Sequence, residues 1–137
     1  MSSKDVRHLT GDIIEESLQD RSVLSQVTIL DTRVEPVTLR HQTPWIERWT
    51  IHRIAVPQQR AAEVAKCLSE ALDAEHAHAW YADIKNEAVH YVIFLHKVFR
   101  VSHDSEEQYA EVVDYGTKLG IPLYQLDFSP TVERWQG

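Results

Sequence analysis

Cysteine and glycine are scarce in this chain, and their scarcity excludes whole classes of protein. The 137 residues include one cysteine, four glycines and five prolines. A single cysteine excludes an intrachain disulfide framework and a thiolate zinc cluster. The chain has no P-loop, GxGxxG or GxSxG motif, so nucleotide binding and serine catalysis through those motifs are excluded as well.

Long apolar runs and an excess of positive charge are also missing. The longest strongly apolar run, residues 91–95, is far shorter than the ~20 residues that span a bilayer. Residues 1–12 contain no apolar stretch typical of a secretory signal. Lys plus Arg number 14 against 21 Asp plus Glu, a formal net charge of −7, which opposes binding to phosphate backbones. We therefore expect a cytoplasmic protein with no membrane and no nucleic-acid partner.

What the chain does contain is an ordinary globular composition. Hydrophobic residues make up 43% and charged residues 26%, and a chain of this length can bury a core as a single domain. We expect a flexible N-terminal arm over residues 1–12, one domain over residues 13–128 and a C-terminal tail over residues 129–137.

The residue pattern predicts an α+β fold. Runs of β-branched and aromatic residues predict strands, and apolar residues with a helical period predict helices. The expected strands are residues 27–37, 49–56, 78–85, 88–96 and 98–102, the expected helices are 58–72 and 105–119, and a short last strand over 123–128 is left open. This order, ββαβββα, favours an antiparallel sheet with two helices on one face, and the ferredoxin-like fold is its nearest common form.

The second helix has the clearest ends. Ser105 and Gln108 have the spacing of a capping box. Gly120 can form a left-handed C-cap, and Pro122 prevents the helix from continuing.

The hairpin predicted around Asn86-Glu87 carries the most informative chemistry. A two-residue turn there sorts the side chains so that one face is almost entirely apolar. Asp83 and His90 then lie on the other face, and a four-residue loop would give the same sorting. We therefore expect Asp83 and His90 to form a cross-strand carboxylate–imidazole pair.

This pair has a catalytic interpretation and a structural one. A carboxylate that orients one ring nitrogen raises the basicity of the other, which suits a general base. In an enzyme, His90 would be the base and Asp83 would orient it. Tyr81 would donate a hydrogen bond, and Lys85 would hold an anionic substrate. The structural interpretation is a surface ion pair worth ~0–1 kcal/mol.

The long connection over residues 39–48 contains Trp45. Connections of this length are often functional loops, and this one would close a pocket over the hairpin. Trp45 would then offer a stacking surface for a small-molecule ligand or a partner. Packing within a loop or core is the plainer interpretation.

Eight histidines raise the question of a metal site. His76 and His78 flank one residue, and such a pair on a strand would point the same way, as metal ligands often do. No HExxH or CxxC motif accompanies them, so scattered exposed histidines explain the number better. We expect no metal and no cofactor.

Short segments of the chain also form a family-like pattern. They are WYADIKN from Trp80, HYVIF from His90, KVF from Lys97 and YGTKLGIP from Tyr115, with IIEESL from Ile13 and TPW from Thr43. The pattern WYADxKN…HYxxF…KxF…LGIP resembles a family of short prokaryotic proteins with no assigned activity. The resemblance covers residues 13–128 and implies a single compact domain, but no activity, cofactor or catalytic residue.

Two functions from different classes follow from these observations. The first is a non-catalytic, cytoplasmic binding or interaction module that self-associates, as a dimer, through a sheet edge or sheet face. Its basis is the expected uncovered face with Tyr81, Val92 and Phe94. The second is a small hydrolase- or isomerase-type enzyme that uses Asp83 and His90 on a small anionic substrate. A pocket around this pair favours the enzyme, and a flat apolar face favours the module.

Overall fold

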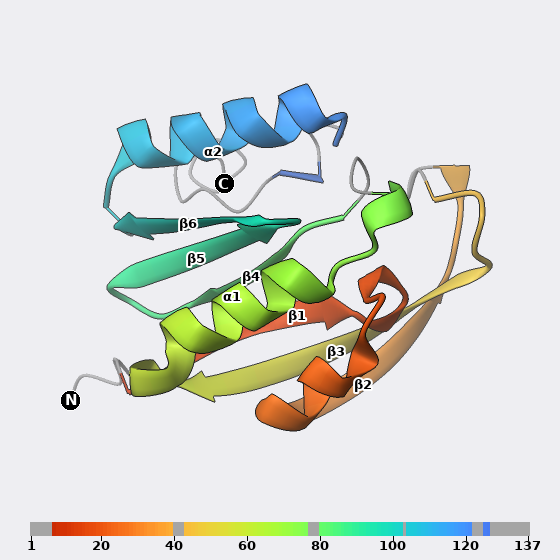
Figure 1. The fold of residues 1–137 in the computed structure, drawn as a ribbon, viewed down its shortest axis with the longest axis horizontal. Helices are drawn as coiled ribbons and strands as arrows, with labels where there is room; N and C mark the ends of the chain where they lie inside the picture. Colours follow the sequence, from red (N-terminus) through yellow and green to blue (C-terminus); the bar gives the residue numbers. More distant parts are fainter. Residues whose placement is uncertain (1–6, 40–42, 77–79, 103, 122–124, 127–137) are drawn as a thin grey trace.

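The computed structural model of the chain describes residues 7–39, 43–76, 80–102, 104–121 and 125–126. Within these ranges, six strands form one antiparallel sheet with helices packed against it (Figure 1). The strands are β1 (His8–Ile14), β2 (Thr28–Pro36), β3 (Arg48–Pro57), β4 (Ala82–Lys85), β5 (Val89–Phe94) and β6 (Lys97–Ser102), and the helices are α1 (Ala61–Ala71) and α2 (Glu106–Leu119). The sheet order is β2-β3-β1-β4-β5-β6, so β2 and β6 form its edges.

The α+β fold with an antiparallel sheet is confirmed. β2 to β6 coincide with the predicted strands to within a few residues, and α1 and α2 lie in the predicted helices. A 3-10 turn, η4 (Gln58–Arg60), occupies the start of the first predicted helix. The observed order, βββαβββα, has one strand more than the predicted order ββαβββα. The ferredoxin-like arrangement stays a prediction.

The additional strand is β1, and it corrects the predicted flexible arm. Residues 8–12 of that arm belong to β1, which lies inside the sheet between β3 and β4. β1 pairs with β3 along its whole length, and its residues Leu9 and Ile13 are fully buried. Gly11 between them interrupts the apolar alternation, which concealed the strand in the sequence.

The helices lie on opposite faces of the sheet, which corrects the expectation that both cover one face. Side chains alternate between the two faces along a strand. In β5, Val89, Tyr91 and Ile93 belong to the core under α1. Val92 and Phe94, which alternate with them, belong to the core under α2 and are each 0% exposed. The uncovered apolar face expected at this place is therefore filled by α2.

The other face of the sheet is accessible beside β1 and β3. Leu9, Ile13 and Ile54 point into the core under α1, so the side chains that alternate with them point the opposite way. We call this surface the open face. It is formed by Thr10, Asp12, Arg33, Trp49, Ile51, Arg53, Asp83 and Lys85.

Helix α2 has the ends that the sequence predicts. The Ser105 hydroxyl accepts a hydrogen bond from the Gln108 backbone N–H at 3.2 Å. The Gln108 side chain accepts from the Ser102 backbone N–H at 2.6 Å, so only half of the predicted capping box forms. Gly120 ends the helix in the left-handed region with φ 110°.

The last part of the chain is described at two positions. Gln125 and Leu126 are not in a strand, and Leu126 is buried in the core under α2. The rest of the strand left open over residues 123–128, and the predicted tail over residues 129–137, lie outside the described residues.

A 3-10 turn that follows β1, η1 (Glu15–Ser17), is fastened to β3 by Glu16. The Glu16 carboxylate accepts hydrogen bonds from the Thr50 backbone N–H at 2.6 Å and from the Thr50 hydroxyl at 2.7 Å. Burial raises the pKa of Glu16, but the hydrogen bonds from Thr50 outweigh it and lower the pKa below its usual value of 4.5. The folded protein therefore stabilises the ionised carboxylate.

This lowered pKa predicts a pH-dependent effect of Glu16→Gln. We expect the variant to lose about 1–3 kcal/mol of unfolding free energy at neutral pH, because hydrogen bonds to a charged group are stronger than neutral ones. The contribution of Glu16 is present above pH 4.5 and is lost as the pH falls through its lowered folded pKa. Urea unfolding at a series of pH values measures the difference between the two proteins. A difference that stays constant down to acid pH would contradict this role.

A second prediction concerns Gly11, where β1 approaches β4 most closely. A Cβ atom at Gly11 would lie 1.8 Å from the backbone oxygen of Asp83. We expect Gly11→Ala to lower the unfolding free energy by about 1–3 kcal/mol or more, because a strand must shift. At Gly116 a Cβ would meet Leu126 methyl groups at 2.9 and 3.0 Å, which can move, so Gly116→Ala should cost less. Equal urea midpoints for Gly11→Ala and the wild type would refute the argument.

Candidate functional site

The β4–β5 hairpin brings Asp83 and His90 together, in a longer loop than a two-residue turn. Lys85 lies opposite His90, whereas a two-residue turn would place it opposite Ala88. The Asn86 side chain holds this longer loop, because it accepts two backbone N–H groups of the loop at 2.8 and 2.9 Å. The sorting of side chains between the faces is the one predicted for a four-residue loop.

His90 is the centre of a buried hydrogen-bonded chain. Its Nε2 lies 2.6 Å from a carboxylate oxygen of Asp83. Its Nδ1 lies 2.8 Å from the hydroxyl oxygen of Tyr109, which belongs to α2. The side chain of His90 is 0% exposed and that of Asp83 is 22% exposed. These two hydrogen bonds therefore connect Tyr109 of α2, through His90, to the Asp83 carboxylate on the open face.

This geometry places His90 behind Asp83. Both ring nitrogens of His90 have hydrogen-bond partners, and the ring has no exposed surface. Such an imidazole is not positioned to take a proton from a bound molecule. Proton transfer at this site would involve the Asp83 carboxylate, and His90 would act as its positioning residue.

A groove with a volume of about 470 Å³ lies on the open face beside Asp83. This volume is within the range of ~300–1,000 Å³ that is common for ligand pockets. Three cationic side chains line it from three strands: Arg33 from β2, Arg53 from β3 and Lys85 from β4. Asp12 and Asp83 are the carboxylates of its lining.

The cations of the groove are weakly engaged. Arg53 lies 3.5 Å from Asp12, and Arg33 lies 3.5 Å from Glu35. The two arginine side chains are 50% and 53% exposed, and exposed pairs of this kind contribute ~0–1 kcal/mol. Lys85 has no ion-pair partner among the residues that the structure describes. An anion entering the groove would therefore break little that stabilises the fold.

Three aromatic residues also line the groove: Trp49, Trp80 and Tyr81. The Trp49 indole N–H donates to the Thr43 hydroxyl at 2.9 Å. The Tyr81 hydroxyl donates to the backbone oxygen of Gln125, so it is engaged with the backbone rather than placed to donate to a substrate. Trp80 is 1% exposed, and within the described part of the chain its Nε1 has no hydrogen-bond partner.

Trp45 does not line the groove, contrary to the expectation for this residue. Its ring stacks on His76, with centroids 3.9 Å apart and planes 11° from parallel. None of the described residues between 39 and 48 lines the groove. In these ranges Trp45 of the connection packs against His76, in the segment that follows α1, and the connection does not close a pocket over the hairpin.

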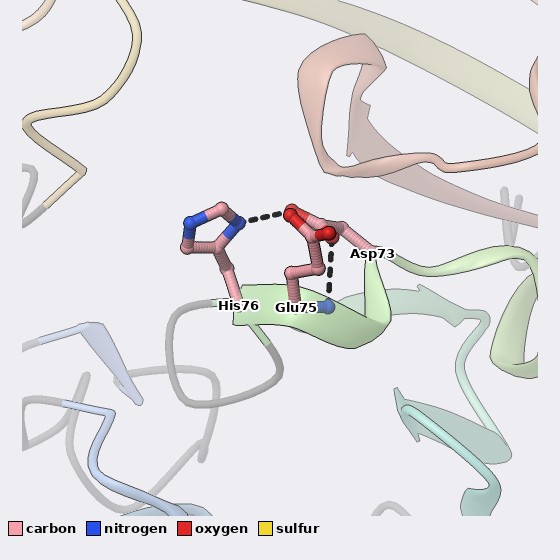
Figure 2. A group of neighbouring side chains, drawn as sticks. All are labelled: Asp73, Glu75 and His76. Carbon is pink, nitrogen blue, oxygen red and sulfur yellow. Dashed lines mark hydrogen bonds and ion pairs between the residues drawn. The ribbon is translucent and has the colours of Figure 1, made fainter.

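Asp73, Glu75 and His76 form a cluster after α1, shown in Figure 2. Each offers one potential metal-ligand atom, and these atoms lie within 4.8 Å of one another. The Asp73 carboxylate accepts from the Glu75 backbone N–H at 3.0 Å and lies 2.6 Å from Nδ1 of His76. These contacts hold the 3-10 turn η5 (Ala74–His76), and that role explains the cluster. His78, the other histidine of the predicted pair, lies outside the described residues.

Comparisons with family models, with curated proteins and with solved structures found no match. The resemblance to a family of short prokaryotic proteins therefore stays a prediction. In the described ranges, no helix has both the length and the apolar character needed to cross a membrane.

Sequence reasoning found part of the groove and missed the rest. Asp83, Tyr81 and Lys85 were predicted as site residues, and all line it. Asp12 was missed because it lay in the expected arm. The two cations that were not predicted, Arg33 and Arg53, lie in predicted strands, where alternation places each on one face. Only the pairing of β1 with β3 and β4 brings that face beside Asp83 and Lys85.

The His90 network predicts a specific cost for Tyr109→Phe. The variant leaves the buried Nδ1 of His90 without its partner, which costs about 1–3 kcal/mol of unfolding free energy. Tyr115→Phe on the same helix is the matched control, because the Tyr115 ring packs on Phe94 and Phe99 and keeps those contacts. Urea unfolding should show a clear loss for Tyr109→Phe and little change for Tyr115→Phe. Equal losses would mean that the hydroxyl of Tyr109 does not support His90.

Proposed function

We propose that the protein is a small, non-catalytic binding module that holds a small anionic molecule with a flat apolar part. The observation that carries this proposal is that Arg33, Arg53 and Lys85 line one groove whose lining also includes aromatic side chains. Guanidinium and ammonium groups are the side chains that bind carboxylates and phosphates. Tryptophan and tyrosine rings provide a surface for a flat apolar group.

The charge balance of the groove supports an anionic ligand. Three cationic and two anionic side chains line it, which leaves one positive charge in a chain of net charge −7. A positive site within a negative protein favours small anions that can enter the groove over extended polyanions that must also meet the acidic surface.

The aromatic lining supports a ligand with a flat apolar part. Trp49 and Tyr81 are half-buried and line the groove, so parts of their rings can contact a bound molecule. Trp80 is 1% exposed and contributes by packing against the Trp49 ring, with centroids 5.8 Å apart.

A hydrolase- or isomerase-type enzyme is the second candidate, and the short contact between Asp83 and His90 favours it. In this enzyme Asp83 would accept a proton from the bound molecule, His90 would position Asp83, and Lys85 would hold the negative charge of the substrate. The module and the enzyme share the groove, which is lined by Asp83 but not by His90. The enzyme arrangement expected from the sequence, with His90 as the base, therefore does not form, and this favours the module. The module and the enzyme differ in whether the bound molecule is converted.

The proposal also includes a cytoplasmic location and self-association. A lone cysteine fits a reducing compartment such as the cytoplasm.

The proposed module needs neither a metal nor another cofactor, because arginine and lysine side chains bind the anion directly.

Binding of phenyl phosphate tests the proposed function. We expect it to change the fluorescence of Trp49 and Trp80, and to bind more tightly than inorganic phosphate or phenol, each of which has half of the required chemistry. Lys85→Ala should weaken binding about tenfold or more, because it removes a charged partner. Lys66→Ala, an exposed lysine of α1, is the control and should leave binding unchanged.

Isothermal titration calorimetry measures these affinities. Equal binding of phenyl phosphate by Lys85→Ala and the wild type, or no binding by the wild type, would show that the groove is not an anion site. Release of phosphate from phenyl phosphate during the titration would favour the enzyme over the module.

A further inference from the structure

Strand β2 is an exposed edge of the sheet (Figure 1). Among the described residues it pairs with β3 alone, so one side of its backbone has no strand partner there. Its exposed side chains include Ile29, Leu30 and Val34, which are 45%, 56% and 59% exposed. A long exposed edge with apolar side chains is a template for pairing with another strand.

We propose that β2 pairs with β2 of a second copy of this chain, antiparallel and centred on Thr32. This proposal deepens the self-association that forms part of the proposed function, because it names the partner and the register. Thr32 is the midpoint of β2, and the paired segment covers residues 30–34, because the register of β2 shifts between Ile29 and Asp31. The main-chain hydrogen bonds of such strand addition provide affinity, and the side-chain pairs provide specificity.

The sequence of β2 is self-complementary in this register. Asp31 lies opposite Arg33 of the partner strand, and this pair occurs twice because of the two-fold symmetry. Leu30 lies opposite Val34, and Thr32 lies opposite itself. Opposite charges, apolar pairs and threonine pairs are the cross-strand combinations that stabilise antiparallel sheets.

Neighbouring registers are less favourable for a reason of charge. Directly opposite residues of paired strands share a sheet face, so the centre of a symmetric pairing must fall on a residue. A centre on Asp31 places that carboxylate opposite itself. A centre on Arg33 places this arginine opposite itself and Asp31 opposite Glu35. A centre on Val34 keeps opposite charges together but places Pro36, which has no backbone N–H, within the paired segment.

An irregularity of β2 limits the length of this pairing. Its pairing with β3 shifts between Ile29 and Asp31, which places the irregularity at Leu30. The residues that form the charge pairs, Asp31 and Arg33, lie on the regular part of the strand. The other edge, β6, carries Lys97 and Arg100 and no carboxylate, so pairing with itself would gather like charges.

The symmetry of this pairing has a consequence for the groove. The two-fold axis is perpendicular to the sheet, so both copies present the open face on the same side of one continuous sheet. Arg33 lines the groove and lies in the strand at the interface. The dimer would therefore place two anion sites side by side across the β2–β2 junction.

Sedimentation velocity of the full chain over a concentration series tests the proposal without any ligand. The wild type should be a dimer that dissociates on dilution. Asp31→Arg replaces both opposite-charge pairs by like-charge pairs and should raise the dissociation constant about tenfold or more. The double variant Asp31→Arg with Arg33→Asp restores the pairs in reverse and should dimerise as the wild type does.

Two further variants keep the test specific. Asp104→Arg makes the same change of net charge at an exposed position after β6 and should leave the dimer intact. Val34→Lys places a charge opposite Leu30 and should weaken the dimer without touching a groove residue.

Each result separates the dimer from the ligand site. A monomeric wild type, an unaffected Asp31→Arg dimer or a monomeric double variant would overturn the proposed pairing. Because Asp31 does not line the groove, monomeric Asp31→Arg should still bind phenyl phosphate. The experiments can therefore refute the proposed anion site and support the dimer, or refute the dimer and support the anion site.

Discussion

The sheet depends on the close contact between β1 and β4. β1 pairs with β3 along its whole length, but its register with β4 consists of Thr10 opposite Lys85. Next to that pair, Gly11 packs directly against the backbone oxygen of Asp83. This contact joins β2-β3-β1 to β4-β5-β6 in one sheet. It also brings the Arg53 side of the groove beside the Asp83 side, so the absence of a Cβ atom at one position determines whether the groove exists.

The predictions that succeeded depend on interactions between residues close in the chain. The left-handed cap at Gly120 and the N-cap at Ser105 follow from the physical chemistry of helix ends. The contact between Asp83 and His90 follows from the alternation of side chains within one hairpin. These features need no knowledge of how the rest of the chain is arranged.

The predictions that failed depend on packing between distant segments. The strand that contains Gly11 is recognisable only through its partners, because its own pattern is polar and interrupted. The alternation in β5 marks two apolar faces, but only the position of α2 shows that Val92 and Phe94 are covered. The sequence likewise placed Asp83 beside His90 and could not show Tyr109 behind them. The candidate site was therefore predictable at the hairpin and unpredictable across the sheet.

The different burial of β5 and β2 has a consequence for how the protein opens. All six residues of β5 are buried, while eight of the nine in β2 are exposed and one is half-buried. Local opening begins where few apolar contacts hold the backbone, so in the undimerised chain amide protons of β2 should exchange with solvent well before those of β5. Partial opening from that edge would remove Arg33 from the groove, while the hydrogen bonds that connect Asp83, His90 and Tyr109 stay intact. Loss of the groove on warming can thus precede loss of the core.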